Sequence, residues 1–370
     1  MPRDPRLPDL EATVNGRLLS RGIRHATFLE RLKTHHGNGV LGVLNRDVLP
    51  DVVDRLRSRL DRIRSRGFDR GPWTTQRYKD MIAGVGSQIT EGLDDAYQSL
   101  RHDLRELGIT EAEWQVARLR QEAGPFGVEF RLPPKPLLRS IVDKRPIEGL
   151  TLGGWFKDIA KRTKQAIAKE VSIGLAEGET VEQMIRRVRG TQARGFTDGV
   201  FQTTRREAQA LVRTSVAHTS AQAREITYDE NAELITGVTW VSTLDHRTCP
   251  VCAGLDAETF QPKEGPRPPA HPNCRCTTVP QLKSWKALGI PLNEAPVGTR
   301  ASMSGQVAGS TDFPGWLRGQ GADVQNEVLG KGRAQLWRAG KVDIDAFRDE
   351  RNRPLSLRDI RKLEGLGEDG

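Results

Sequence analysis

Apolar residues recur every three or four positions along much of the first 230 residues, which is the spacing at which side chains share one face of an α-helix. Residues 49–66 carry the set Val52, Val53, Leu56, Leu60 and Ile63. A similar stripe predicts one or two long helices over residues 74–107, although glycines inside it argue against an unbroken helix. Thr110 followed by Glu113 is a capping-box signature, which predicts a separate helix through Arg120.

Glycine and proline clusters divide this helical half of the chain. His36-Gly37-Asn38-Gly39 predicts a break after a weak helical stretch over residues 26–32. Residues 124–136 are rich in glycine and proline and predict a linker or an extended arm. A second helical block begins near Gly154 and includes a long helix over residues 201–228.

The period changes to two after residue 236, because Val238, Trp240, Ser242 and Leu244 alternate with Thr239, Val241 and Thr243. Residues 295–313 have the composition of a loop, and the tail beyond Pro314 predicts short helices. The expected fold is mainly α with a small α+β core. It has long helices in the N-terminal half, a short β element, and a cysteine-rich, zinc-knuckle-like region near residues 238–280.

The pattern predicts three consecutive domains: a helical N-terminal region over residues 1–140, a core with a Cys/His cluster over residues 141–285, and a C-terminal tail with a linker and short helices over residues 286–370. With 36% hydrophobic residues and 37 glycines, the chain can bury a core. We expect no signal peptide, because the N-terminal Met-Pro-Arg-Asp-Pro carries no apolar h-region, and no membrane anchor, because no segment approaches about 18 consecutive apolar residues. The net charge of +9 favours polyanionic neighbours.

The four cysteines lie together in the sequence, as Cys249-Pro250-Val251-Cys252 and His271-Pro272-Asn273-Cys274-Arg275-Cys276. Two such pairs can close a tetrahedral, thiolate-rich shell, which selects zinc. His271 makes five candidates for four positions, and both four cysteines and three cysteines with His271 remain open. A full shell would be structural and would contribute folding energy. Asp245, Arg247 and Asn273 are expected to support the shell through hydrogen bonds or a local ion pair.

Other interpretations of the cluster are reduced cysteines packed in a small core, a redox pair, or a metal-supported nuclease that uses His246, His271 or Asn273. The redox interpretation lacks the βαβ context that it needs. The sequence has no nucleotide-binding or nucleophile-elbow motif. We therefore expect no enzyme and no small-molecule substrate, with the nuclease as the alternative.

Two groups of basic residues lie at helical spacing and could contact nucleic-acid phosphates: Arg55, Arg59 and Arg62, and Lys157, Lys161 and Lys164. Neighbouring acidic residues favour the simpler interpretation of solvated helix faces. His218, in a segment of small residues, is expected to be a hydrogen-bonded residue on a packed helix.

The sequence resembles the phage Mu F-like head morphogenesis family, also called minor head or minor capsid proteins. The resemblance rests on Arg213-Thr214-Ser215-Val216-Ala217-His218, Trp240, Leu244-Asp245-His246-Arg247-Thr248 with the first cysteine pair, Gly254, and His271 to Cys276. It covers about residues 150–280, so the 141–285 region is interpreted as the Mu F-like core. Many members lack the first cysteine pair, and its presence here strengthens the zinc hypothesis. The segment from Trp316 to Lys341 resembles, more weakly, a tail that often follows this core.

The resemblance implies a structural component of the virion, present in few copies inside the head near the portal vertex and made in the host cytoplasm. It implies a role in head morphogenesis and in DNA packaging or delivery. The implied partners are the portal protein, the major capsid or scaffold proteins, and packaged double-stranded DNA.

Overall fold

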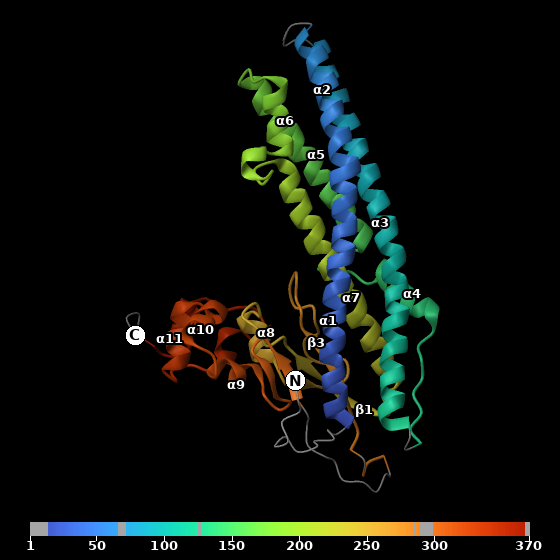
Figure 1. The fold of residues 1–370 in the computed structure, drawn as a ribbon, viewed down its shortest axis with the longest axis vertical. Coiled ribbons are helices and arrows are strands. Elements are labelled where there is room, and N and C mark those ends of the chain that lie inside the picture. The colour runs from blue at the N-terminus through green and yellow to red at the C-terminus, as the bar shows by residue number, and fades with distance from the viewer. Residues whose placement is uncertain (1–13, 66–71, 125–126, 285, 289–298, 367–370) are drawn as a thin grey trace. The chain divides into compact units, whose positions relative to one another are not determined.

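The computed structural model describes residues 14–65, 72–124, 127–284, 286–288 and 299–366. Long helices occupy most of the first 230 residues, and short elements follow (Figure 1). The elements of this part of the chain are α1 (Val14–Val43), the π-helix η1 (Leu44–Val48), α2 (Leu49–Ser65), α3 (Pro72–Ala123), α4 (Lys135–Lys144), α5 (Leu152–Ala176), α6 (Val181–Arg189), the 3-10 helix η3 (Gln192–Arg194) and α7 (Val200–Glu230).

The later elements form small sheets and a helical C-terminal region. They are β1 (Ile235–Val241), α8 (Pro250–Leu255), β2 (Thr259–Phe260), β3 (Thr277–Leu282), β4 (Thr299–Ser302), β5 (Gly305–Ala308), α9 (Phe313–Arg318), α10 (Ala322–Leu329), α11 (Lys331–Arg338), the 3-10 helix η4 (Ile344–Phe347) and α12 (Leu357–Leu363). The structure confirms the expected fold class of long helices in the N-terminal half with a small β element and a Cys/His region.

The chain forms two compact units that interleave along the sequence. The sheet unit comprises Met1–Glu30, Ile109–Leu138 and Ser220–Gly370, and the helical unit comprises Arg31–Gly108 and Arg139–Thr219. Each unit is therefore built from separate segments of the chain. The three consecutive domains predicted above follow the order of the sequence, whereas these two units follow contacts in space. The three domains therefore stay a prediction.

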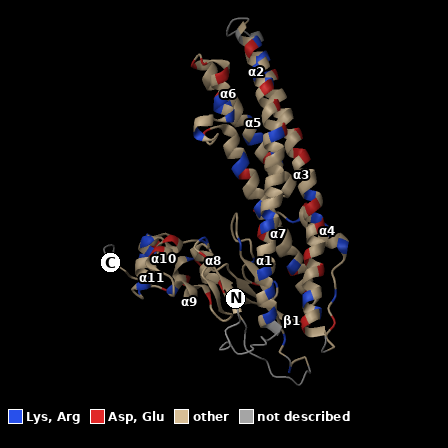
Figure 2. Cartoon of the chain, viewed as in Figure 1, with Lys and Arg blue, Asp and Glu red and all other residues tan. Residues whose placement is uncertain are grey.

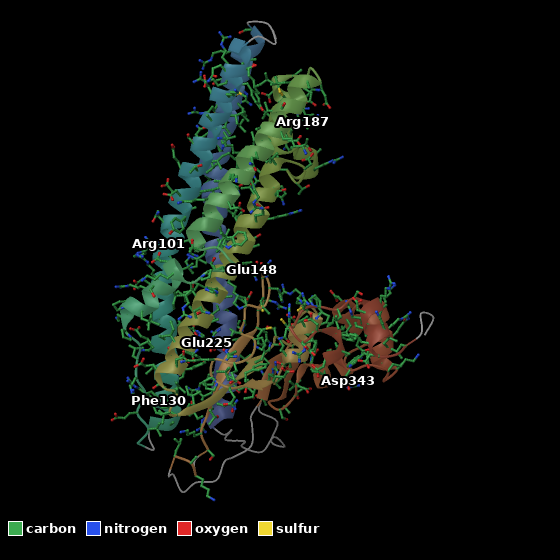
Figure 3. The ribbon with its side chains drawn as sticks, turned by 180° about the vertical axis from the view of Figure 1, so that it is seen from behind. Arg101, Phe130, Glu148, Arg187, Glu225 and Asp343 are labelled. Carbon is green, nitrogen blue, oxygen red and sulfur yellow. The ribbon has the colours of Figure 1, made fainter. Side chains whose placement is uncertain are left out.

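In the helical unit, the predicted apolar stripe of α2 is buried along its whole length, from Val52 to Ile63. Thr180 caps α6 through the side-chain and backbone bonds of a capping box with Gln183. Arg187 of α6, labelled in Figure 3, pairs with three glutamates of the same unit, Glu170, Glu177 and Glu179. Basic and acidic side chains are interspersed along these helices (Figure 2).

Of the one or two helices predicted over residues 74–107, the structure has one, because the glycines inside this segment do not break it. Helix α3 runs unbroken through Gly84, Gly86 and Gly92. A Cβ at Gly92 would lie 2.3 Å from Val48 Cγ2, and one at Gly86 would lie 2.6 Å from Lys164 Cδ. These glycines therefore allow close packing against neighbouring side chains, and that packing offsets a helix-propensity cost of about 1 kcal/mol for each glycine.

Two further predicted helix boundaries do not exist. Helix α1 continues through the segment 36–39, where His36 Nδ1 lies 3.3 Å from Asp103 Oδ2, and the apolar face resumes at the buried Val40. Thr110 lies inside α3, because Ile109 and Ala112 continue the buried stripe and leave no interruption for a cap. In both places, the continuous burial of one helix face outweighs the local glycine and capping signals and keeps the helix unbroken.

The sheet unit contains a three-stranded antiparallel sheet in the order β2-β1-β3. The central strand β1 pairs Val238 with Phe260 of β2 and Val241 with Thr277 of β3. Its inner face packs on side chains from α1, α3 and α7 of the same unit in one cluster, together with Phe130 (labelled in Figure 3) of the predicted extended arm: Leu18, Val116, Leu119, Ala123, Phe130, Tyr228, Ile235, Val238 and Leu282.

The C-terminal residues add a second hairpin and a helical core to the sheet unit. The predicted loop over residues 295–313 was wrong where it is described, because β4 and β5 pair from Thr299 with Ala308 to Ser302 with Gly305. Residues 295–298 lie outside the described residues. Phe313, Trp316 and Trp337 form the centre of a buried cluster that also includes Leu244 and Ala253. The tail is therefore packed against the residues that follow β1.

Glu111 of α3 is a fully buried carboxylate held between two partners of the sheet unit. Its side chain lies 2.7 Å from His25 Nε2 and 3.1 Å from Arg224 Nη1. Burial raises the pKa of Glu111, but the charge of Arg224 and the bond with His25 outweigh burial and lower the pKa from 4.5 to about 2. The ionised carboxylate therefore stabilises the folded state above pH 4.5.

We expect stability to fall as the pH drops from about 4.5 to 2, by about 3 kcal/mol from this group, because the folded carboxylate must then be protonated. Glu111→Gln should lower stability by a similar amount at pH 7 and should flatten that acid limb in urea unfolding curves. Glu113→Gln, at an exposed position of the same helix, is the matched control. Equal acid limbs in the two variants would contradict the assignment.

Candidate metal centre

The first cysteine pair opens a short helix directly after the central strand. Cys249 is the N-cap of α8, its Sγ accepts a hydrogen bond from the backbone N–H of Cys252 at 3.4 Å, and Pro250 occupies the first turn. A proline there lacks only an N–H that the helix would leave unpaired. The C-P-V-C sequence therefore folds locally into a turn that brings both sulfurs to one side.

The second half of the cluster arrives through strand pairing. His271 to Cys276 lead into β3, whose first residue Thr277 lies opposite Val241 at the end of β1. Asn273 adopts a positive φ of 61°, a conformation that asparagine tolerates better than most residues, and so turns the chain between His271 and Cys274. The antiparallel pair thus brings the segments on either side of residues 253–270 together.

The five candidate ligands form two overlapping groups that share Cys252. Cys249, Cys252 and His271 make one group and Cys252, Cys274 and Cys276 the other, with all ligand atoms of a group within 4.8 Å of one another. His271 Nε2 lies 3.4 Å from the Sγ atoms of both Cys249 and Cys252. Cys252 and Cys274 are buried, and the four thiols are free of disulfides. These Cys/His groups could hold a metal ion.

The thiols and the imidazole shift one another's protonation. A bond from Cys252 lowers the pKa of Cys249 to about 4, and bonds from Cys252 and Cys276 lower that of Cys274. Contact with the Cys249 sulfur raises the pKa of His271 to about 9 despite burial. The same sulfur–sulfur bonds raise the pKa of Cys252 and of Cys276. The site therefore stabilises two of its four sulfurs, Cys249 and Cys274, as thiolates, the form that binds metal ions.

Each group of three ligands has the donors and the spacing that a tetrahedral metal ion requires at three of its four positions. With metal–ligand bonds of about 2.0–2.3 Å, the ligand atoms of a tetrahedral site lie roughly 3.5–3.8 Å apart. The 3.4 Å separations at His271 are near this value, and each three-membered group falls within 4.8 Å. Sulfur and imidazole nitrogen are the donors that zinc prefers.

Asp245 organises the turn between β1 and the first cysteine pair. Its carboxylate accepts two bonds from Arg275, at 2.5 and 2.6 Å, and one from the backbone N–H of Arg247 at 3.0 Å. The ion pair joins this turn to the residue between Cys274 and Cys276. The Arg247 side chain is 68% exposed, with Nε 3.9 Å from Asp245. The backbone of Arg247, rather than its guanidinium, makes the closer contact with Asp245.

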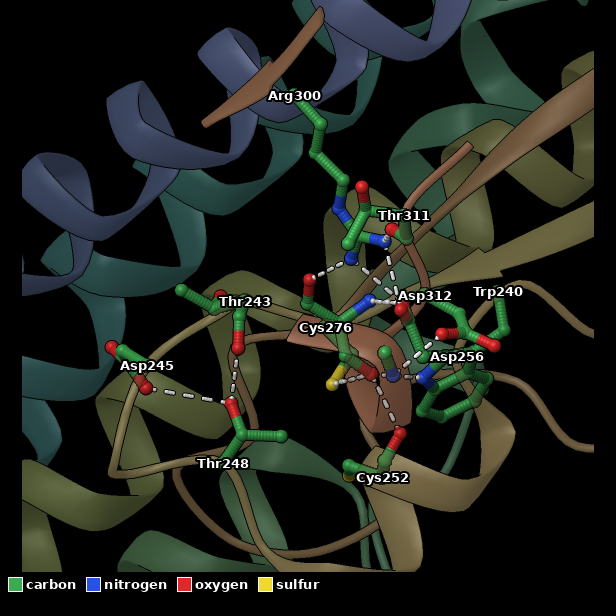
Figure 4. Close-up of polar contacts among 12 residues, drawn as sticks. Trp240, Thr243, Asp245, Thr248, Cys252, Asp256, Cys276, Arg300, Thr311 and Asp312 are labelled. Atoms are coloured by element: carbon green, nitrogen blue, oxygen red, sulfur yellow. Dashed lines mark hydrogen bonds and ion pairs between the residues drawn. The ribbon is translucent and has the colours of Figure 1, made fainter. Parts of the chain in front are cut away.

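A buried polar network lies behind the cysteines (Figure 4). The Ser242 hydroxyl accepts from Trp240 Nε1 at 3.0 Å and donates to the backbone carbonyl of Cys252 at 2.6 Å. Asp256 accepts from the backbone N–H of Ser242 at 2.7 Å and pairs with Arg300 of β4 at 2.7 Å. Arg300 also donates to the Ser242 carbonyl and to the Thr311 carbonyl, the latter at 3.0 Å.

Ser242, Asp256 and Arg300 support the site as well and were not predicted from the sequence. Strand alternation places Ser242 on the same face as Trp240, and this signal could have indicated the serine. Arg300 is 44 residues from Asp256, and no local pattern connects them. Only the packing of the second hairpin brings this arginine to the cluster.

The remaining predicted residues lie elsewhere. His246 belongs to neither Cys/His group, and its Nε2 is 3.9 Å from Glu327 of α10. In the helical unit, Arg59, Arg62, Lys157 and Lys161 are exposed, whereas Arg55 and Lys164 are partly buried beside Gly84 and Gly86.

His218 differs from its expectation. Within the described residues its buried Nε2 has no hydrogen-bond partner, and burial with the nearby charge of Arg145 lowers its pKa to about 4. The helix is packed as predicted, but the imidazole is not fully hydrogen-bonded. A neutral ring is therefore favoured at this position.

Comparison with known proteins identifies one family. The profile described as Phage Mu protein F like protein matches residues 143–279, which include α5 to α7, the three-stranded sheet up to Val279 and the whole Cys/His cluster. Neither a curated protein nor a solved structure matches the chain. None of the described helices is long and apolar enough to cross a membrane. Residues 143–279 of this chain are therefore similar to the phage Mu F-like family, which suggests a phage head-related protein.

Proposed function

We propose that the protein is a minor head protein, a structural component of the virion that is associated with the portal vertex and acts in head morphogenesis and DNA packaging or delivery. The family match over residues 143–279 carries this proposal. The portal protein and the major capsid or scaffold proteins are its proposed partners. Its place is inside the head, near the portal.

The Cys/His cluster has a structural part in this proposal. A zinc ion bound by four of Cys249, Cys252, His271, Cys274 and Cys276 would link the turn after β1 to the segment before β3. The ion would supply folding energy and no turnover, because four protein ligands fill its coordination shell. The region would then present a fixed surface to neighbouring head proteins.

The exposed cations of the helical unit are the proposed contacts to packaged double-stranded DNA or to an acidic portal surface. Lys157 and Lys161 of α5 are exposed, as are Arg59 and Arg62 of α2. Spacing of four residues places Lys157 and Lys161 on one side of the helix, where they can follow a row of phosphates.

The position in the virion can be tested directly. Quantitative mass spectrometry of purified, DNA-filled particles should detect the chain at far fewer copies than the major capsid protein. Asymmetric cryo-EM reconstruction of particles with an antibody-labelled C-terminus should show density at a single vertex. Absence from purified particles, or a copy number close to that of the major capsid protein, would contradict the proposal.

A further inference from the structure

The sheet unit carries a pocket of about 680 Å³ between its segments of α1 and α3. Helix α1 contributes Arg21, Arg24, His25 and Phe28, which are spaced by three or four residues and share one face. Helix α3 contributes Trp114 and Arg118 to the same pocket. The described lining therefore combines aromatic rings with three arginines and contains no acidic residue.

The rings form a stack that ends in an accessible face. His25 lies on Trp114 with ring centroids 3.9 Å apart and planes 11° from parallel. Phe28 continues the stack at 5.7 Å and 24° from His25. Phe28 is 49% exposed and is the only aromatic residue among the exposed large hydrophobic side chains of the described chain. His25 is fixed from below by Glu111, at 2.7 Å from Nε2.

Gln121 binds two of the three arginines beside this stack. Arg21 and Arg118 both donate to Gln121 Oε1, at 2.6 and 2.7 Å, and the Arg118 guanidinium lies 5.8 Å from the centroid of Trp114. Arg24 is exposed, and its Nε bonds the backbone carbonyl of Ser20 rather than a carboxylate of the described residues. Arg21 also pairs with Glu122, whose Oε1 lies 3.1 Å from Arg21 Nη2, so the positive charge next to the exposed ring rests mainly on Arg24 and Arg118.

We propose that this pocket binds single-stranded nucleic acid, with an unstacked base on Phe28 and backbone phosphates on Arg24, Arg21 and Arg118. Aromatic platforms flanked by arginine bind single strands because every base has a π-face and every nucleotide a charge. A duplex would leave the platform unused, because its bases are already stacked. The carboxylates of an acidic peptide could pair with the arginines, but they would offer no planar group to stack on Phe28. The inference goes beyond the proposed head role and does not depend on it.

Binding can be measured by the anisotropy of a fluorescein-labelled (dT)12 oligonucleotide added to the full chain. Phe28→Ala should weaken binding about ten-fold by removal of the stacking face. Arg24→Glu should weaken it at least as much and reduce its dependence on salt. The matched controls are Leu363→Ala, at an apolar side chain that is 70% exposed, and Arg358→Glu, at an exposed arginine of α12, and both should bind like the wild type.

Three outcomes would overturn the proposal. The first is binding of (dT)12 that Phe28→Ala and Leu363→Ala leave equally strong. The second is a 12-base-pair duplex that binds as tightly as (dT)12 and whose affinity Phe28→Ala does not change. The third is a polyglutamate peptide of equal charge that competes as well as unlabelled (dT)12, which would identify an acidic protein as the occupant. Circular dichroism of each variant verifies that the fold is retained.

Discussion

Cys252→Ser is expected to abolish most zinc binding and to cost the chain more than about 4 kcal/mol of stability when zinc is present. The reason is geometric. Cys252 is the one residue that belongs to both Cys/His groups, so its loss leaves neither group with three sulfur or nitrogen donors. Zinc content by elemental analysis and urea unfolding followed by circular dichroism measure the two effects.

A chelator separates the metal effect from simple loss of a buried side chain. The wild type should lose stability when the chelator removes zinc, whereas Cys252→Ser should be almost insensitive to it. Cys249→Ser removes a ligand of one group only and should retain more zinc than Cys252→Ser. A wild-type protein whose zinc content is far below one ion per chain, or whose unfolding ignores the chelator, would contradict a structural zinc site.

The second large effect is expected at Arg300. Its guanidinium is 4% exposed and its partner Asp256 is fully buried, so Arg300→Leu would leave a carboxylate in the interior without its counter-charge. Breaking such a pair from one side costs about 3–5 kcal/mol. The same variant removes the donor to the Ser242 carbonyl, and Ser242 bonds the carbonyl of Cys252 at 2.6 Å.

Two further variants test this account. Asp256→Asn combined with Arg300→Leu removes both charges and keeps an acceptor for the Ser242 N–H, so it should recover part of the lost stability. Arg353→Leu, at an arginine that is 69% exposed and paired with Asp349, should cost less than about 1 kcal/mol. A single Arg300 variant no less stable than Arg353→Leu would show that the buried pair contributes little.

Features set by local sequence could be predicted, and features set by distant partners could not. The α2 stripe and the strand after residue 236 depend on neighbours within a few residues, and both are present. The clustering of the four cysteines was visible as spacing. The unbroken α3 was not, because the role of Gly92 depends on Val48, 44 positions earlier.

The candidate site follows the same rule. Cys249 and Cys252 come together through one helical turn, which their spacing determines. Their approach to Cys274 requires the pairing of β1 with β3. The sequence indicated that the cysteines come together but did not indicate this strand pairing. The Asp256–Arg300 pair joins residues 44 positions apart, and the stacking of His25 on Trp114 joins residues 89 positions apart (114 − 25), separations that no periodicity in the sequence reports.

The interleaving of the two units has a practical consequence for anyone who wants to express part of this protein. The backbone passes from one unit to the other after Glu30, after Gly108, after Leu138 and after Thr219. No single cut can release either unit whole. A fragment trimmed to the family-matched residues 143–279 would lack the segments of α1 and α3 on which its sheet packs, and would expose Ile235 and Val238 to water. Such a fragment should aggregate, and soluble expression will require both flanks.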